Sequence, residues 1–119
     1  MKLKRYVLLD NNRIVDLKVE ADHKIDRIAY LGKPLLIGNK DFGKIIATSD
    51  DATDFIREND LVRYEDYNGV LIVGEVEEVE DIRNNWVLLE TKILPKNRIV
   101  TIYKLIGDDY ICVWKKEEV

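Results

Sequence analysis

The densest group of polar side chains in the sequence is a run of carboxylates near its centre, and it is the main candidate for chemistry. The run consists of Glu75, Glu77, Glu78, Glu80 and Asp81. Such carboxylates can form a solvated surface, bind a basic partner, hold a divalent cation or act as paired catalytic acids. The run lacks the Asp-x-Asp-x-Asp-Gly spacing of a calcium loop, and catalytic carboxylate pairs need burial. A solvated face and a docking surface for a basic protein both remain open.

The other residue types that could carry chemistry stand alone. His23 is the only histidine and lies in a polar segment, which is more typical of a solvated loop than of a metal site. Cys112 alternates with Ile111 and Val113, the pattern of a small buried residue in a strand. The six glycines form neither GxxxxGK nor GxGxxG. We therefore predict no catalytic residue, no metal and no cofactor.

Composition predicts one folded domain that spans residues 1–119. Hydrophobic residues make up 46% of the chain and charged residues 35%, so a core can form without metals or disulfides. The single cysteine excludes an internal disulfide and favours a reducing compartment. The sequence shows no signal peptide or membrane span. We expect a cytoplasmic protein that is not embedded in a membrane.

Charge is distributed unevenly along the chain. Residues 1–49 contain ten basic and six acidic residues, residues 50–90 contain three and thirteen, and residues 91–119 contain six and four. The acidic middle section repels the phosphates of nucleic acids and attracts basic protein surfaces. We expect a protein partner with a basic surface, and no direct binding of nucleic acid.

The first half of the chain predicts short strands and one helix. Residues 4–9 and 13–20 suit a hairpin through an Asn-Asn dipeptide, and a two-residue loop would pair Leu8 with Val15. A short helix is expected near residues 51–58, since acidic side chains precede an apolar stripe there. Further strands are expected at residues 27–31, 35–37 and 44–48.

The second half predicts two hairpins with a strand between them. Asn68-Gly69 is a strong two-residue turn signal, which would pair Tyr64 with Val73. Alternation fails after Gly74, which predicts a bulge or a helical turn in the acidic run. A further strand is expected over Trp86–Ile93, and a hairpin over Ile99–Ile106 and Asp109–Trp114.

The final hairpin offers a second candidate surface. A turn at Gly107-Asp108 would place Tyr103, Tyr110 and Trp114 on one face with Leu105 and Cys112. Both faces of this hairpin are apolar, which is typical of a central strand pair or of one covered by another subunit. We therefore regard Tyr103, Tyr110 and Trp114 as a surface for an oligomer or a partner. The chain as a whole predicts a mainly β fold, an antiparallel barrel or sandwich of about eight strands with one short helix.

Three stretches of the sequence carry a resemblance to known proteins. They are Lys4 to Leu17 (KRYVLLDNNRIVDL), Ile45 to Tyr64 (IIATSD through NDLVRY) and Val100 to Trp114 (VTIYK with DYICVW). Together they resemble small accessory proteins encoded by phages and prophages of Gram-positive bacteria, a group without an assigned reaction. The resemblance implies a phage protein acting in the bacterial cytoplasm, for which inhibition of a host defence protein is one role.

The leading hypothesis is a non-enzymatic inhibitor that presents the acidic run to a basic host protein. One alternative is a phage structural or assembly component that forms homo-oligomers through residues 99–114. Another is a sponge that binds a signalling nucleotide between subunits.

Overall fold

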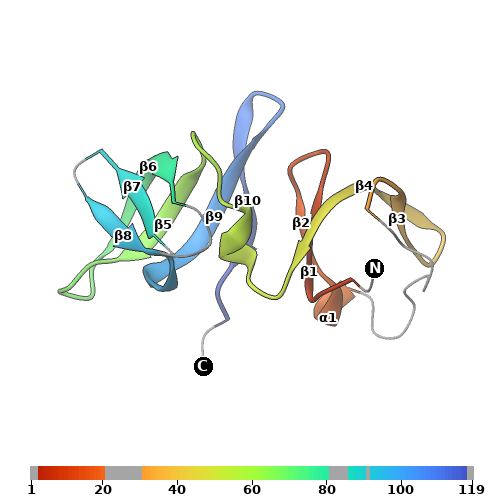
Figure 1. Cartoon of the computed structure of the whole chain (residues 1–119), viewed down its shortest axis with the longest axis horizontal. Coiled ribbons are helices and arrows are strands. Elements are labelled where there is room, and N and C mark those ends of the chain that lie inside the picture. Colours follow the sequence, from red (N-terminus) through yellow and green to blue (C-terminus); the bar gives the residue numbers. More distant parts are fainter. Residues whose placement is uncertain (1–2, 21–30, 81–85, 91, 118–119) are drawn as a thin grey trace. The chain divides into compact units, whose positions relative to one another are not determined.

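The computed structural model describes residues 3–20, 31–80, 86–90 and 92–117. The chain divides into two compact units, Met1–Ala52 and Thr53–Val119, and each is described by itself. Within the described residues ten strands form two antiparallel sheets (Figure 1), which confirms the mainly β prediction with more strands than the eight expected. Neither sheet closes into a barrel among the described strands. The prediction of a single domain over residues 1–119 stays a prediction.

The first unit contains a four-stranded sheet with the order β2-β1-β4-β3. Its elements are β1 Tyr6–Leu9, β2 Ile14–Asp16, α1 Leu17–Glu20, β3 Pro34–Ile37 and β4 Lys40–Ser49. The core is apolar and comes from all four strands and the start of α1. It consists of Val7, Leu9, Val15, Leu17, Leu35 and Ile45. The expected strands at 35–37 and 44–48 are present, whereas residues 27–30 and His23 lie outside the described part.

The first hairpin differs from the predicted register by one residue. Leu8 pairs with Ile14, not with Val15, because the loop has three residues rather than two. The Leu9 amide donates to the Arg13 carbonyl at 2.9 Å, which closes a loop of residues 10–12. Within this loop only Asn12 has a positive φ, of 68°. A turn that ends in one left-handed residue is the common three-residue hairpin loop.

Strand β2 is also shorter than the predicted strand at 13–20, because Asp16 ends it. The Asp16 carboxylate accepts a hydrogen bond from the Lys18 amide at 3.0 Å, which suits the start of helix α1. Arg5 donates two further bonds to the same carboxylate, from Nε at 3.1 Å and from Nη2 at 2.9 Å. Burial raises the pKa of Asp16, but these bonds outweigh it, so that the pKa lies below its usual value.

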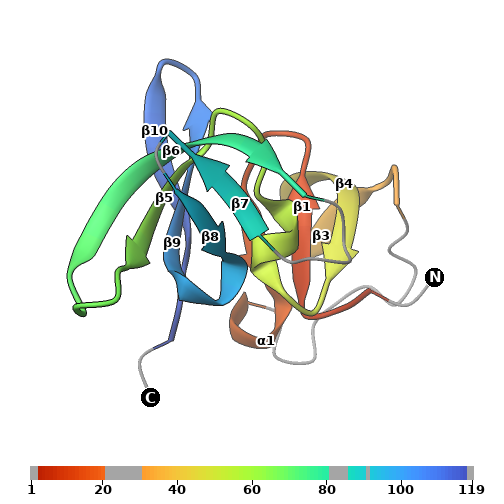
Figure 2. The same cartoon turned by 60° about the vertical axis from the view of Figure 1, so that its left-hand side comes forward.

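The second unit contains a six-stranded sheet with the order β10-β9-β5-β6-β7-β8 (Figure 2). Its elements are η1 Ala52–Phe55, which begins at the unit boundary, β5 Leu61–Glu65, β6 Leu71–Val79, β7 Trp86–Leu89, β8 Ile93–Pro95, η2 Lys96–Arg98, β9 Ile99–Ile106 and β10 Asp109–Lys115. Its fully buried apolar residues include Phe55, Ile56, Val62, Val76, Val87, Ile99 and Ile102. The strand expected over Trp86–Ile93 is divided into β7 and β8, and between them the Leu89 amide donates to the Lys92 carbonyl at 2.8 Å.

The helix expected near residues 51–58 is a single 3-10 turn, η1. The chain leaves helical geometry because Asp60 accepts a hydrogen bond from the Arg57 amide at 2.9 Å. The Arg57 guanidinium in turn donates to the backbone carbonyls of Asp54 and Ile56 at 2.8 and 3.0 Å. These bonds offer the backbone an alternative to helical hydrogen bonds.

The β5–β6 hairpin repeats the register difference of the first hairpin. Tyr64 pairs with Ile72, not with Val73, because the loop holds three residues and only Gly69 has a positive φ, of 78°. Asp66 closes this loop, since its Oδ1 accepts hydrogen bonds from the amides of Asn68 and Val70 at 2.8 and 2.9 Å. An aspartate just before a turn commonly accepts hydrogen bonds from backbone amides of that turn, and here these bonds stabilise the three-residue loop.

The last hairpin has the predicted two-residue turn but not the predicted faces. Asp109 pairs with Ile106 as expected, and the register then shifts after Cys112, so that Trp114 lies opposite the buried Ile102. Strand β10 is an edge strand of its sheet, which corrects the expectation of a central position. Cys112 is exposed, so the prediction that it is buried was wrong.

Candidate functional site: the glutamates of β6

Strand β6 exposes three of the five carboxylates that the sequence singles out. Glu75, Glu77 and Glu78 are exposed, whereas Val76 between them is buried. The β6–β7 register shifts between Val76 and Glu78, so that the bulge is present and not the helical turn that the loss of alternation equally predicted. A bulge adds one residue to one strand, and here both residues after Val76 point to solvent. The bulge therefore concentrates negative charge that strict alternation would have split between two faces.

The remaining two carboxylates of the run do not share this position. Glu80 is half-buried, follows the end of β6 and takes part in an interaction of its own. Its amide donates to the Trp86 carbonyl at 3.2 Å, which continues the contact with β7. Asp81 lies outside the described residues. The exposed part of the predicted site is thus the group Glu75, Glu77 and Glu78, which we call the β6 glutamates.

The turn before β5 adds a carboxylate next to the bulge. The Asn59 amide donates to the Val76 carbonyl at 2.8 Å, and the Val76 amide donates to the Asp60 carbonyl at 2.9 Å. These bonds hold the turn against β6 and place the exposed Glu58 beside the bulged part of the strand. The sequence did not place Glu58 beside the acidic run, because its position depends on this pairing.

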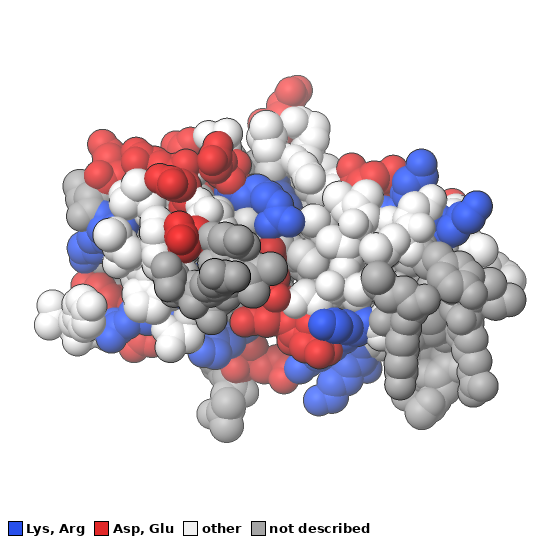
Figure 3. Space-filling model, viewed as in Figure 1, with Lys and Arg blue, Asp and Glu red and all other residues white. Residues whose placement is uncertain are grey.

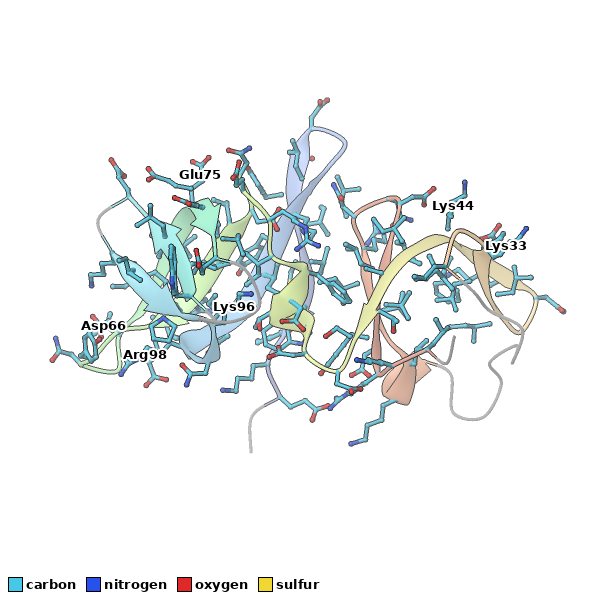
Figure 4. All side chains as sticks on the ribbon, in the orientation of Figure 1. Lys33, Lys44, Asp66, Glu75, Lys96 and Arg98 are labelled. Carbon is cyan, nitrogen blue, oxygen red and sulfur yellow. The ribbon has the colours of Figure 1, made fainter. Side chains whose placement is uncertain are left out.

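The β6 glutamates have no ion pair among the residues that the structure describes. Figure 3 shows a group of acidic side chains over the part of the molecule that contains β6. In Figure 4 the side chain of Glu75 projects away from the ribbon. The β6 glutamates are thus exposed at positions fixed by the strand that carries them.

The carboxylate of Asp60, in the turn before β5, is buried, and its hydrogen bonds are made within the fold. Lys104 Nζ donates to Asp60 Oδ2 at 2.6 Å, and the two side chains are only 3% and 11% exposed. The same Asp60 oxygen accepts the Arg57 amide. Removing a charged pair from water is costly unless both partners are hydrogen-bonded, as they are here. The pair fixes the turn before β5 onto β9, and we assign it a structural role.

The structure separates the three aromatic residues of the second predicted surface. Tyr103 is half-buried opposite Cys112, and Tyr110 is 42% exposed with its hydroxyl donating to the Asn59 carbonyl at 3.1 Å. Trp114 is half-buried beyond the register shift at Val113. The shift removes Trp114 from the row that Tyr103 and Tyr110 were predicted to share with it.

Neither a metal-binding cluster nor a membrane-spanning helix is found in the described part of the chain. No group of three or more His, Cys, Asp or Glu side chains there could hold a metal ion. None of the described helices is long and apolar enough to cross a membrane. Comparison with models of protein families, with curated proteins and with solved structures finds no match to this chain.

Proposed function

We propose that this chain is a non-enzymatic binding protein that docks the β6 glutamates onto a basic surface of a protein partner. The observation that supports it is the exposure of Glu75, Glu77 and Glu78 on an ordered strand, without ion pairs among the described residues. The fold gains nothing from this arrangement, because like charges held close together repel one another.

A basic partner would relieve that repulsion and gain charge-assisted hydrogen bonds from its lysines or arginines. Because the glutamates are exposed, their attraction would act mainly on the association rate and would weaken as salt is added. The acidic surface also disfavours direct binding of nucleic acid. The expected signature is thus a salt-sensitive complex with a protein.

The nature of the partner follows from the resemblance to phage and prophage accessory proteins. A small phage protein acting in the bacterial cytoplasm meets host defence proteins there, and those that bind nucleic acid have basic surfaces. Inhibition of such a host defence protein is the role that we propose. A carboxylate row would compete with phosphates for the same arginines and lysines.

The test is a pull-down from lysate of the bacterial host with the full chain and with a variant that carries Glu75→Gln, Glu77→Gln and Glu78→Gln. We expect the wild-type chain to capture a partner with a basic surface and the variant to lose it. A control with Glu90→Gln, Asp108→Asn and Asp109→Asn removes the same charge from other exposed positions of this unit. Equal capture by wild type and the β6 variant would refute the proposal.

A second candidate function is homo-oligomerisation through the final hairpin, as in a phage structural or assembly component. The observation in its favour is that β10 is an edge strand, with Leu105 and Tyr110 48% and 42% exposed on this hairpin. Unpaired strand edges can recruit a further strand. Size-exclusion chromatography with light scattering tests this candidate, because a strict monomer at high concentration rules it out.

A further inference from the structure

Two strongly exposed apolar side chains, Tyr67 and Ile93, lie together at the β5–β6 turn, beside Tyr64 and Leu94. Tyr67 is 84% exposed and Ile93 is 66% exposed. Apolar patches rimmed by polar residues mark interaction sites more often than single exposed residues do. We call this group, with the cations around it, the turn-end patch.

An arginine holds the most exposed residue of the patch in place. The Arg98 guanidinium lies 4.1 Å from the centre of the Tyr67 ring, and its Nη1 donates to the Glu65 carbonyl at 3.3 Å. Figure 4 shows Arg98 near Asp66, the residue that precedes Tyr67 in the turn. The ring is thus ordered before any partner arrives, which lowers the entropy cost of binding. Tyrosine and arginine are also the residue types that dominate binding energy at interfaces.

The surface next to Tyr67 is hollowed on more than one side. One hollow of about 240 Å³ is lined by the apolar side chains of Tyr64, Ile93 and Leu94, with Lys92 and Arg98 at its edge. A second, of about 450 Å³, is lined by polar residues that include Asn97. The first can accept an apolar side chain, and the second suits polar groups of the same ligand.

The charge available around these hollows is mainly positive. Lys92 and Arg98 line the first hollow with Asp66, and Arg98 and Lys116 line the second with Glu65 and Asp66. Asp66 is engaged by two amides of its turn. No ion pair of Lys92, Arg98 or Lys116 is found within the described residues. This end of the unit therefore complements an acidic ligand.

From these observations we infer that the turn-end patch binds an acidic segment of a protein, with one apolar side chain seated in the 240 Å³ hollow. Carboxylates on either side of that side chain would reach Lys92 and Arg98. A phosphorylated small molecule would use the cations but would leave the apolar side chains of Tyr64, Ile93 and Leu94 without a partner. The apolar share of the patch therefore favours a peptide.

The experiment is a nuclear magnetic resonance titration of the isotope-labelled full chain with a short synthetic peptide in which Glu and Asp alternate with Leu and Phe. We expect chemical-shift changes at residues 65–71 and 92–98. Tyr67→Ala and Arg98→Ala should each weaken binding about tenfold, as hot-spot substitutions do. Both side chains lie at the surface, so the variants should fold, which the dispersion of the same spectra verifies.

Four comparisons make the result decisive. Lys33→Ala with Lys44→Ala removes two exposed cations from the first unit and should leave the affinity unchanged. A peptide with Ser in place of Leu and Phe should bind much more weakly, and equal binding would overturn the proposal. Stronger binding of ATP than of the acidic peptide, or shifts unaffected by Arg98→Ala, would also overturn it. The Gln variant of the β6 glutamates should bind the peptide normally, which separates this site from the proposed function.

Discussion

Two acidic regions of the second unit differ in how the fold uses their carboxylates. Asp60 and Asp66 flank β5, and both are tied into the structure by hydrogen bonds to amides or to a lysine. The β6 glutamates, on the next strand, have no such partner among the described residues. A similar density of charge in the sequence thus has opposite structural consequences.

The difference follows from side-chain length and from position. An aspartate before a turn can reach the amides two to four residues onward, so Asp66 stabilises its loop. A glutamate on the outward face of a strand points away from the backbone of its own sheet, so its carboxylate does not reach the amides of that strand. A carboxylate in a turn is therefore best explained by its role in stabilising the fold. An exposed carboxylate on a strand is the better candidate for binding a partner.

Breaking the buried pair should have the largest effect on stability. Lys104→Met leaves Asp60 as a buried carboxylate without its cation, which should lower the free energy of unfolding by about 3–5 kcal/mol. Urea denaturation followed by circular dichroism measures the change. Lys104→Met combined with Asp60→Leu should recover part of the loss, because it removes both charges. A loss well under 1 kcal/mol for the single variant would contradict the assigned structural role.

Removing the carboxylate of Asp66 should have a smaller effect. Asp66→Ala deprives the amides of Asn68 and Val70 of their acceptor in a solvent-exposed loop, which should cost about 1–2 kcal/mol. The matched control is Asp108→Ala, which changes an exposed aspartate in the two-residue turn of the last hairpin. Denaturation midpoints compare the two variants, and equal midpoints would show that Asp66 is not a turn-closing residue.

Asp16 is a carboxylate of the first unit that the fold also uses, and its contribution to stability should depend on pH. Its pKa is lowered in the folded state, from an ordinary value of 3.8, so its contribution is present above that value and is lost as the pH falls through the lowered pKa. Asp16→Asn should cost about 1 kcal/mol at neutral pH, since the pair with Arg5 is partly exposed. In acid the variant and the wild type should converge in stability. A constant difference from neutral to acidic pH would contradict this account.

The sequence allowed most of the strand positions and the last hairpin's turn to be predicted, and it indicated a bulge or a helical turn in the acidic run, of which the bulge is present. It did not allow the register of the first two hairpins, because Asn11-Asn12 and Asn68-Gly69 fit two-residue and three-residue loops equally well. One residue of register decides which side chains face each other. The Asp60–Lys104 pair and the Tyr67–Arg98 contact were missed for another reason. Each joins segments far apart in the chain, and local sequence patterns do not show which of these segments meet.

The smallest effect on stability is expected where the effect on binding should be greatest. Neutralising Glu75, Glu77 and Glu78 with Gln breaks no hydrogen bond or ion pair among the described residues and relieves like-charge repulsion. The free energy of unfolding should therefore stay within about 0.5 kcal/mol of wild type, as for most surface changes, or rise slightly. Thermal and urea unfolding of the variant used in the pull-down provide the measurement. A marked loss of stability would mean that the fold does use these glutamates, and a loss of partner binding would then no longer argue for a docking surface.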